Sequence, residues 1–491
     1  MDRRKFLLLS LASGGALTIG RGFLAPAFAA PAEPGDSPYG PLGEPDDLGL
    51  RLPDGFTSRT IKQFGLPIGS LVGLDKVGLP FPDGAATFPT DDGGWILVSN
   101  SENPPPADIT DPTPIGLDQL GGTQAIRFAA DGTITDAYSI LSGSRSNCAG
   151  GATPWGTWLS CEEVDDGDDA ANSGRVYECD PTGANAAVDL PLLGRFKHEN
   201  ATVDPVRQCV YQSEDIGDGL FYRFTPTTYP DLTAGVLEAA LVADDGSVTW
   251  LEIADPACTG GIPCRQQAAA TTFNGGEGCV YDDGKVFLTT KGDDRVWMYD
   301  AESEVMTILY DASDFTDPVL TGVDHIIVQP GTGNLVIAED GGDLEAVMIR
   351  RSDFAVFPIL QMTGPQHFEL VGAPVVSEVS GLAFDPSGER LYFNSQRAFG
   401  GITYEVTGPW LAALQEDETP PTTEAAPTTT LAPTTTTPPT PSTGILPATG
   451  GGSLGPLAVG AGAAAAGLMA LRKRLDRRMP DEIATEAADG P

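Results

Sequence analysis

The sequence is poor in basic residues and in histidine. Its 491 residues include 28 lysines and arginines against 68 aspartates and glutamates, a formal net charge of −40, and only three histidines. Binding a phosphate backbone needs a basic face, so this balance excludes nucleic acid as a partner. The scarcity of histidine argues against a covalent Ser-His-Asp mechanism. The surplus of carboxylates suits hard cations such as calcium, with simple solubility as the alternative reading.

Long apolar runs are confined to the two ends of the chain. Near the N-terminus a twin arginine, Arg3-Arg4, precedes an apolar stretch that ends in the small-residue pattern Ala27-Phe28-Ala29. This order predicts a Tat-type export signal over residues 1–29, which takes no part in the fold. An ordinary Sec signal and an uncleaved anchor are the alternatives.

The C-terminal part predicts attachment to the cell surface. Residues 415–445 are mostly Thr, Pro, Ala and Glu, a composition that forms an extended linker rather than a core. Residues 446–478 contain the motif Leu-Pro-Ala-Thr-Gly, an apolar segment long enough to span a bilayer and a basic cluster. This order resembles a sortase sorting signal, although an acidic tail, 479–491, follows it. The expected C-terminal partner is sortase or, for a plain single-pass anchor, the membrane.

The chain has few cysteines, and their number is odd. The chain has seven cysteines, and export permits disulfides. Cys258 and Cys264 flank a short loop and predict one bridge. An odd total leaves at least one thiol unpaired.

Residues 30–414 repeat one pattern six times. Each copy has a polar or acidic residue, a short alternating strand, a turn rich in Asp, Gly or Pro, and a second strand that ends in acidic or amide residues. No long stretch has the periodicity of an amphipathic helix. Such repeats are typical of β-propellers, so we expect an all-β, six-bladed β-propeller. The copies begin at Asp83, Asn147, His198, Glu277, Asp324 and Glu378.

The hairpins predict a concentration of negative charge. In a hairpin the start of the first strand lies beside the end of the second strand. If six hairpins surround one axis, their acidic ends meet at one mouth of the central channel. Carboxylates so close together cannot all ionise without compensation, and bound cations are the natural compensation. The alternative is that single acidic residues only satisfy backbone donors in turns.

The second copy carries the most specific motif in the chain. Residues Asn147–Glu163 read NCAGGATPWGTWLSCEE, which closely resembles the signature of PhoX-like alkaline phosphatases. The segments Gly194–Glu199 and Glu378–Gly381 are similar to further family motifs. The resemblance implies a six-bladed propeller that holds iron and calcium in its channel and hydrolyses phosphate monoesters.

The same resemblance implies a set of metal ligands. Cys148 stands where the family has a thiolate ligand of iron, and thiolate is a soft ligand while carboxylates suit calcium. A Cys148–Cys161 disulfide is the alternative. Ligands carried over by position are Cys148, Glu162, Glu199, Glu277, Asp324, Glu339 and Glu378, with Glu102 as a weaker member.

Three positions depart from the family pattern near the channel mouth. Ser101 replaces a histidine before Glu102, His325 replaces an asparagine, and Arg397 lies in a Gln-Arg-Ala-Phe-Gly segment where the family has Gln-His-Pro-Gly. These changes leave the substrate range open. They keep two alternatives in view: a non-catalytic calcium-stabilised surface propeller, and a calcium-dependent propeller lactonase or phytase.

The expected reaction follows from a multinuclear site. We hypothesise that a metal-activated oxygen attacks the phosphorus in line, because metals neutralise the anionic substrate and lower the pKa of bound water. Lys197, Lys291 and Arg397 are the predicted phosphate-binding residues. The expected partner is a small phosphate ester, and we expect a monomer.

Overall fold

The structure is a computed structural model in which the N-terminal segment and the long C-terminal part are not described. The predicted export signal, Cys264, the sorting-signal-like segment and the acidic tail therefore lie outside the described residues, as does the linker beyond residue 417. Within the described part, no helix has the length and apolar character needed to cross a membrane. The described residues are 32–73, 76–103, 121–164, 174–259, 267–363, 367–370 and 373–417.

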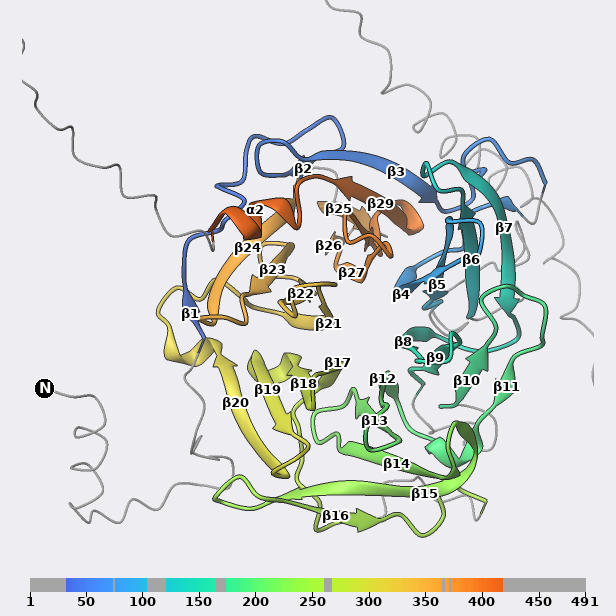
Figure 1. Ribbon diagram of the computed structural model, residues 1–491, viewed down its shortest axis with the longest axis vertical. Helices are drawn as coiled ribbons and strands as arrows, with labels where there is room; N and C mark the ends of the chain where they lie inside the picture. The colour runs from blue at the N-terminus through green and yellow to red at the C-terminus, as the bar shows by residue number, and fades with distance from the viewer. Residues whose placement is uncertain are drawn as a thin grey trace, which may run out of the picture. The chain divides into compact units, whose positions relative to one another are not determined.

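Six sheets stand around a common centre, antiparallel except for the β1–β24 pair, and each contains one of the six predicted hairpins (Figure 1). The all-β, six-bladed β-propeller is therefore confirmed. Blade 1 consists of β4 (Pro82–Pro89), β5 (Trp95–Ser101), β6 (Gly122–Phe128) and β7 (Ile134–Leu141). Blade 2 consists of β8 (Asn147–Ala152), β9 (Trp158–Glu162), β10 (Val176–Cys179) and β11 (Val188–Asp189). Blade 3 consists of β12 (His198–Asp204), β13 (Cys209–Glu214), β14 (Phe221–Thr228), β15 (Asp231–Val242) and β16 (Val248–Glu252).

Of the remaining blades, blades 5 and 6 recruit strands from the N-terminal part of the chain. Blade 4 consists of β17 (Gly276–Asp282), β18 (Lys285–Thr290), β19 (Arg295–Asp300) and β20 (Val305–Asp311). Blade 5 consists of β21 (Val323–Val328), β22 (Leu335–Glu339), β23 (Glu345–Ile349) and β24 (Ala355–Met362), with β1 (Glu33–Pro34) and β2 (Leu50–Arg51) paired to β24. Blade 6 consists of β27 (Val379–Phe384), β28 (Arg390–Ser395), β29 (Ile402–Thr407) and β3 (Thr57–Gln63).

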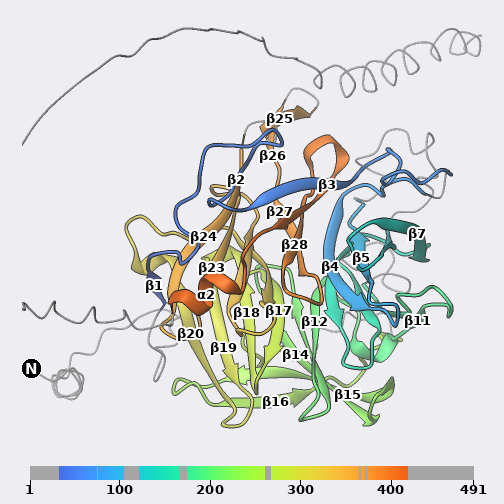
Figure 2. The same cartoon turned by 45° about the horizontal axis from the view of Figure 1, so that its top comes forward.

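Few elements lie outside the blades. The hairpin β25 (His367–Leu370) and β26 (Ala373–Val376) precedes β27 and projects from one side of the ring (Figure 2). In the described part of the chain, a short α-helix, α2 (Ala412–Asp417), follows blade 6. The 3-10 turns are η2 (Pro191–Leu193), η3 (Lys291–Asp293), η4 (Ala312–Asp314) and η6 (Ala398–Gly400).

Strand β3 closes the ring. It comes from the N-terminal part of the chain and pairs antiparallel with β29, with Thr57 opposite Thr407. Across this pair, Arg59 contacts the buried Glu405 at 2.7 Å, and Arg390 contacts the same carboxylate at 3.0 Å. Closure pairs an edge that would otherwise be open to other strands.

Apolar side chains between neighbouring blades form the core. Trp95 stacks on Phe128 at 5.2 Å within blade 1, and its indole nitrogen donates to the Tyr392 hydroxyl of blade 6 at 3.1 Å. Ile61 of β3 is buried in the same cluster. Burying a large apolar side chain contributes about 1.5–3 kcal/mol, so each blade is stabilised chiefly by its neighbours.

The innermost strand of every blade carries an irregularity in its register. In five blades the shift encloses one potential metal ligand, because pairing is interrupted between the residues that flank it. In blade 6 the shift lies between Ser380 and Ala383, just after Glu378. A bulge bends the strand and re-aims a side chain. The five enclosed residues are Asp83, Cys148, Glu199, Glu277 and Asp324.

Candidate metal centre

Among the residues that the structure describes, nine acidic or thiol side chains, at least one from each blade, converge at the end of the channel where the inner strands begin. They form four groups of three, and within each group the potential ligand atoms lie within 4.8 Å of one another. The first group is Asp83, Glu102 and Cys148; the second is Cys148, Glu163 and Glu199; the third is Glu199, Glu277 and Asp324; and the fourth is Asp324, Asp340 and Glu378.

Neighbouring groups share residues. Cys148 belongs to the first and second groups, Glu199 to the second and third, and Asp324 to the third and fourth. The Cys148 thiol lies 3.3 Å from Asp83 Oδ2 and 3.2 Å from Glu199 Oε1, and it donates its hydrogen bond within this carboxylate pair. The groups therefore form one continuous arc of donors.

Burial makes the charged forms of these donors costly. It raises the pKa of Asp324 to about 7 and raises the pKa values of Glu102, Glu199, Glu277 and Glu378 well above their usual range. Neighbouring carboxylates add to this effect. Burial also raises the pKa of the Cys148 thiol, and the nearby carboxylates raise it further. Cations bound among these atoms would stabilise their ionised forms.

Three basic side chains reach the same arc, and they are the three predicted phosphate-binding residues. Lys197 Nζ lies 2.7 Å from Glu163 Oε1 and 3.5 Å from Asp215 Oδ2. Lys291 Nζ lies 2.7 Å from Glu277 Oε1. About a third of each of the Lys291 and Arg397 side chains is exposed.

Arg397 forms the most extensive of these pairs. Its Nη1 and Nη2 atoms lie 2.6 and 3.2 Å from the two oxygens of Asp340, and Nη2 also pairs with Glu378. Although burial acts in the opposite direction, the hydrogen bond from Arg397 and the charge of Lys291 lower the pKa of Asp340. Asp340 is thus already compensated by fixed positive charge.

Two ligands predicted from the sequence lie outside the four groups. The Glu162 carboxylate accepts hydrogen bonds from the backbone amides of Arg145 and Arg175, at 2.9 and 3.1 Å. Glu339 likewise accepts from the amides of Thr321 and Glu345. The other predicted ligands all belong to the groups: Cys148, Glu199, Glu277, Asp324, Glu378 and the weaker candidate Glu102.

Three members of the groups were not among the predicted ligands. Glu163 and Asp340 each follow a predicted ligand directly in the sequence, and Asp83 opens the first hairpin. The acidic pairs were visible in the sequence, but the choice within each pair was not. Asp83 was marked only by its place at the start of a repeat.

Ser101 and His325, two predicted departures from the family pattern, and Gln396, which precedes the third, have different surroundings. The Ser101 hydroxyl donates to the Pro80 carbonyl at 2.6 Å and is buried. Gln396 donates to Asp83 Oδ2 and Glu102 Oε2 at 2.6 and 2.7 Å, so it orients the first group. His325 is buried next to Asp324, and burial lowers its pKa to about 4.

The alternative prediction, a Cys148–Cys161 disulfide, is wrong. Cys148 and Cys161 are both buried free thiols, so no disulfide joins them. Cys148 is therefore available as a donor. A thiol and eight carboxylates, buried with three basic partners, fit metal cations because thiolate is a soft ligand and carboxylates are hard ligands.

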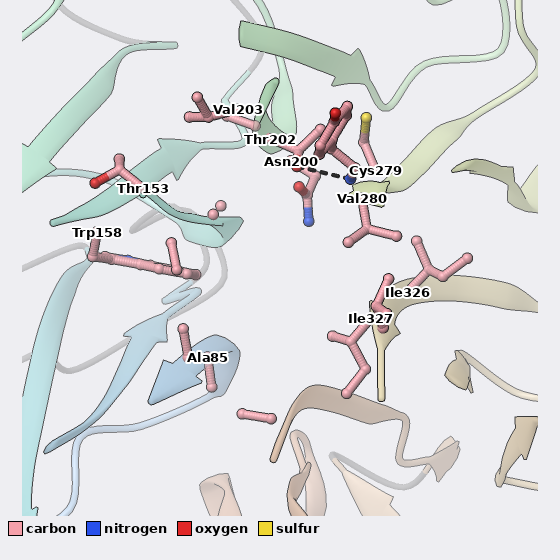
Figure 3. A pocket seen from close by; sticks show the side chains of 18 of the residues that line it. Ala85, Thr153, Trp158, Asn200, Thr202, Val203, Cys279, Val280, Ile326 and Ile327 are labelled. Atoms are coloured by element: carbon pink, nitrogen blue, oxygen red, sulfur yellow. Dashed lines mark hydrogen bonds between the residues drawn. The ribbon is translucent and has the colours of Figure 1, made fainter. Parts of the chain in front are cut away.

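A neutral cavity occupies the other part of the channel. It has a volume of about 470 Å³ and is lined mainly by residues that lie farther along the same six inner strands, including Ala85, Val203, Val280 and Ile327 (Figure 3). None of the described residues that line it is acidic, lysine or arginine. The metal-binding capacity of the channel is therefore concentrated at one end.

The fold and the site together define a class: a six-bladed β-propeller with a buried arc of metal-binding donors at one end of its channel. The model of the family described as alkaline phosphatase PhoX matches residues 109–307. The predicted resemblance is confirmed over these residues, and the match supports the predicted enzyme class, a phosphatase hydrolase.

One solved structure supports the fold, and a second has a lower similarity. Pseudomonas fluorescens PhoX, solved in complex with vanadate, a transition state analogue, has a TM-score of 0.59 and 16% identity, covering 79% of this chain and 98% of its own. A Bacteroides thetaiotaomicron protein of unknown function has a TM-score of 0.44 and 11% identity, covering 72% of this chain and 76% of its own. No curated protein matches the chain.

Proposed function

We propose that this protein is an exported, surface-attached phosphatase that hydrolyses small phosphate monoesters with the help of iron and calcium. The family match supports the phosphatase class. The observation that carries the proposal is the arc of four donor groups, which contains one thiol and eight carboxylates. Three basic side chains lie beside these donors. The twin arginine and the C-terminal motif support export and attachment.

The chain supplies two kinds of metal site. The first and second groups contain the Cys148 sulfur, which suits iron, whereas the third group contains only carboxylates, which suit calcium. When bound, these ions supply Lewis acidity and lower the pKa of water, which is the chemistry that a metal-activated oxygen nucleophile requires. Gln396 holds Asp83 and Glu102 in position for this role.

The three basic residues bind the substrate in this proposal. Each is anchored by carboxylates of the arc or beside it, and each keeps part of its side chain exposed at the mouth. An anchored cation loses little conformational freedom when it receives a phosphoryl oxygen. Lys197, Lys291 and Arg397 thus orient the phosphate and stabilise its charge as the ester bond breaks.

The experiment that tests the proposal compares two cysteine variants. Wild type purified with its metals is expected to hydrolyse an aryl phosphate and to lose activity with a chelator. Cys148→Ala is expected to lose on the order of 100-fold or more in activity and to contain less iron, because it removes a donor shared by two groups. The control, Cys179→Ala, removes a buried thiol of β10 and should keep both properties.

The outcomes are distinct. The proposed enzymatic activity would be refuted if wild type contained iron and calcium but showed no phosphatase activity that a chelator abolishes. If folded Cys148→Ala had the same iron content and the same activity as wild type, the thiol would not be an iron ligand. Surface labelling of intact cells, with and without the segment 446–478, tests attachment, and unchanged surface retention after its removal would contradict that part.

A further inference from the structure

Basic contacts are distributed unevenly along the arc. Among the described residues, the first group receives the neutral amide of Gln396 and no basic contact within 4.0 Å. The second group is contacted by Lys197, and the third by Lys291. The fourth group is contacted by both Lys291 and Arg397. Fixed positive charge therefore increases from one end of the arc to the other.

In the fourth group every carboxylate is engaged by a basic side chain. Arg397 holds both oxygens of Asp340 and also pairs with Glu378. Lys291 Nζ lies 3.3 Å from Asp340 Oδ2 and 3.5 Å from Asp324 Oδ2. A two-pronged arginine–carboxylate pair fixes the orientation of both partners. The oxygens of this group thus face side-chain cations.

A metal ion in the fourth group would compete with these contacts. Calcium needs oxygen ligands at about 2.3–2.6 Å, and here it would have to take oxygens already bound by Arg397 and Lys291. It would also lie beside two positive charges in a buried region, where like charges repel strongly. In the first group the side chain that contacts the Asp83 and Glu102 oxygens is the neutral Gln396, so a metal ion there displaces no cation.

We propose that Arg397 and Lys291 replace a metal ion in the fourth group, so that metal binds to the first three groups only. The inference rests on the proposed function, because it assumes that those three groups bind metal. Glu378, predicted as a ligand, then serves to anchor Arg397.

The test measures metal content and position rather than activity. Wild type and Arg397→Gln are equilibrated with calcium, freed of unbound ions and analysed for calcium equivalents per chain. We expect the variant to gain about one equivalent, because removing the guanidinium frees Asp340 and Glu378. Crystals soaked in manganese should show an anomalous peak at the fourth group in the variant and none there in wild type.

Arg295→Gln is the matched control. Arg295 also pairs with two carboxylates, Asp293 at 2.7 Å and Asp311 at 2.6 Å, and both lie outside the four groups. Its replacement removes the same charge and the same number of carboxylate partners. Its calcium content should equal that of wild type.

The possible outcomes test the inference and the proposed function separately. A manganese peak at the fourth group of wild type overturns the inference, as does a folded Arg397→Gln protein with unchanged calcium content. If Arg397→Gln does not fold, the wild-type anomalous map decides alone. If wild type binds no metal in any group, the proposed function itself fails.

Discussion

Adjacent acidic residues have opposite environments in this site. Glu163 contributes to the second group and pairs with Lys197 at 2.7 Å, whereas Glu162 accepts two backbone amides from neighbouring loops. The same division separates Asp340 from Glu339. Successive side chains point to opposite sides at the end of a strand, so one residue of each pair faces the donors and the other fixes a loop.

This division predicts a difference between two conservative variants. Glu163→Gln should lower the metal content at unchanged thermal stability, because it neutralises a donor of the second group. Glu162→Gln should keep the metal content but lose about 1–3 kcal/mol of stability, because an amide cannot accept both backbone hydrogen bonds. Elemental analysis and urea unfolding measure the two properties. The reverse pattern would show that Glu162 is the ligand.

The sequence could indicate these pairs but not assign roles within them. Strand alternation shows that Glu162 and Glu163 face opposite ways, and it leaves open which of them faces the channel. That choice depends on the loop amides of Arg145 and Arg175, which lie 17 and 13 residues from Glu162 in the chain and approach it only in the folded structure. Most single donors that open an inner strand, such as Glu199 and Glu277, could be predicted because they recur at the same place in each repeat.

At the scale of elements, the inner strands approach one another closely. A Cβ atom added to Gly151 of β8 would lie 1.8 Å from the backbone oxygen of Ala201 in β12. This contact joins blades 2 and 3 beside Cys148 and Glu199. The hairpins themselves could be predicted from alternation and turn residues, but the bulges could not, because they depend on hydrogen-bond register rather than on composition.

Gly151→Ala should therefore destabilise the protein by about 1–3 kcal/mol, since the methyl group forces two backbones apart. Thermal unfolding of the metal-loaded protein measures this loss. Gly217→Ala is the control, because its added Cβ would meet its nearest neighbour at 3.6 Å. Equal unfolding temperatures for both variants would contradict the close approach.

At the scale of the molecule, the ring closes where blade 6 meets blade 1. The six blades could be predicted from the six repeats, but the contribution of β3 to blade 6 could not, because its partner β29 is more than three hundred residues away. Lys62 of β3 is buried at this seam, and its ammonium donates to the Ser99 hydroxyl of blade 1 at 3.3 Å. Burial lowers the pKa of Lys62 to about 7.

Because burial lowers the pKa of Lys62, we expect the free energy of unfolding to depend on pH. Between about pH 7 and pH 10 the unfolded chain holds a proton on this lysine that the folded chain lacks, so stability should rise with pH by up to about 1.4 kcal/mol per unit. Lys62→Met has no lysine to titrate. Its stability relative to wild type should therefore be greatest below pH 7, and the difference should shrink toward pH 10. Urea unfolding of both proteins at pH 6, 8 and 10 checks this. A constant difference would contradict it.

The sharing of Cys148, Glu199 and Asp324 between neighbouring groups has a consequence for how ions enter and leave. A donor pulled toward one ion is positioned for the next, so occupancy of one group would raise the metal affinity of its neighbour through that common atom or carboxylate. Loading and stripping of the channel are then cooperative, and a partly filled centre is a minor species.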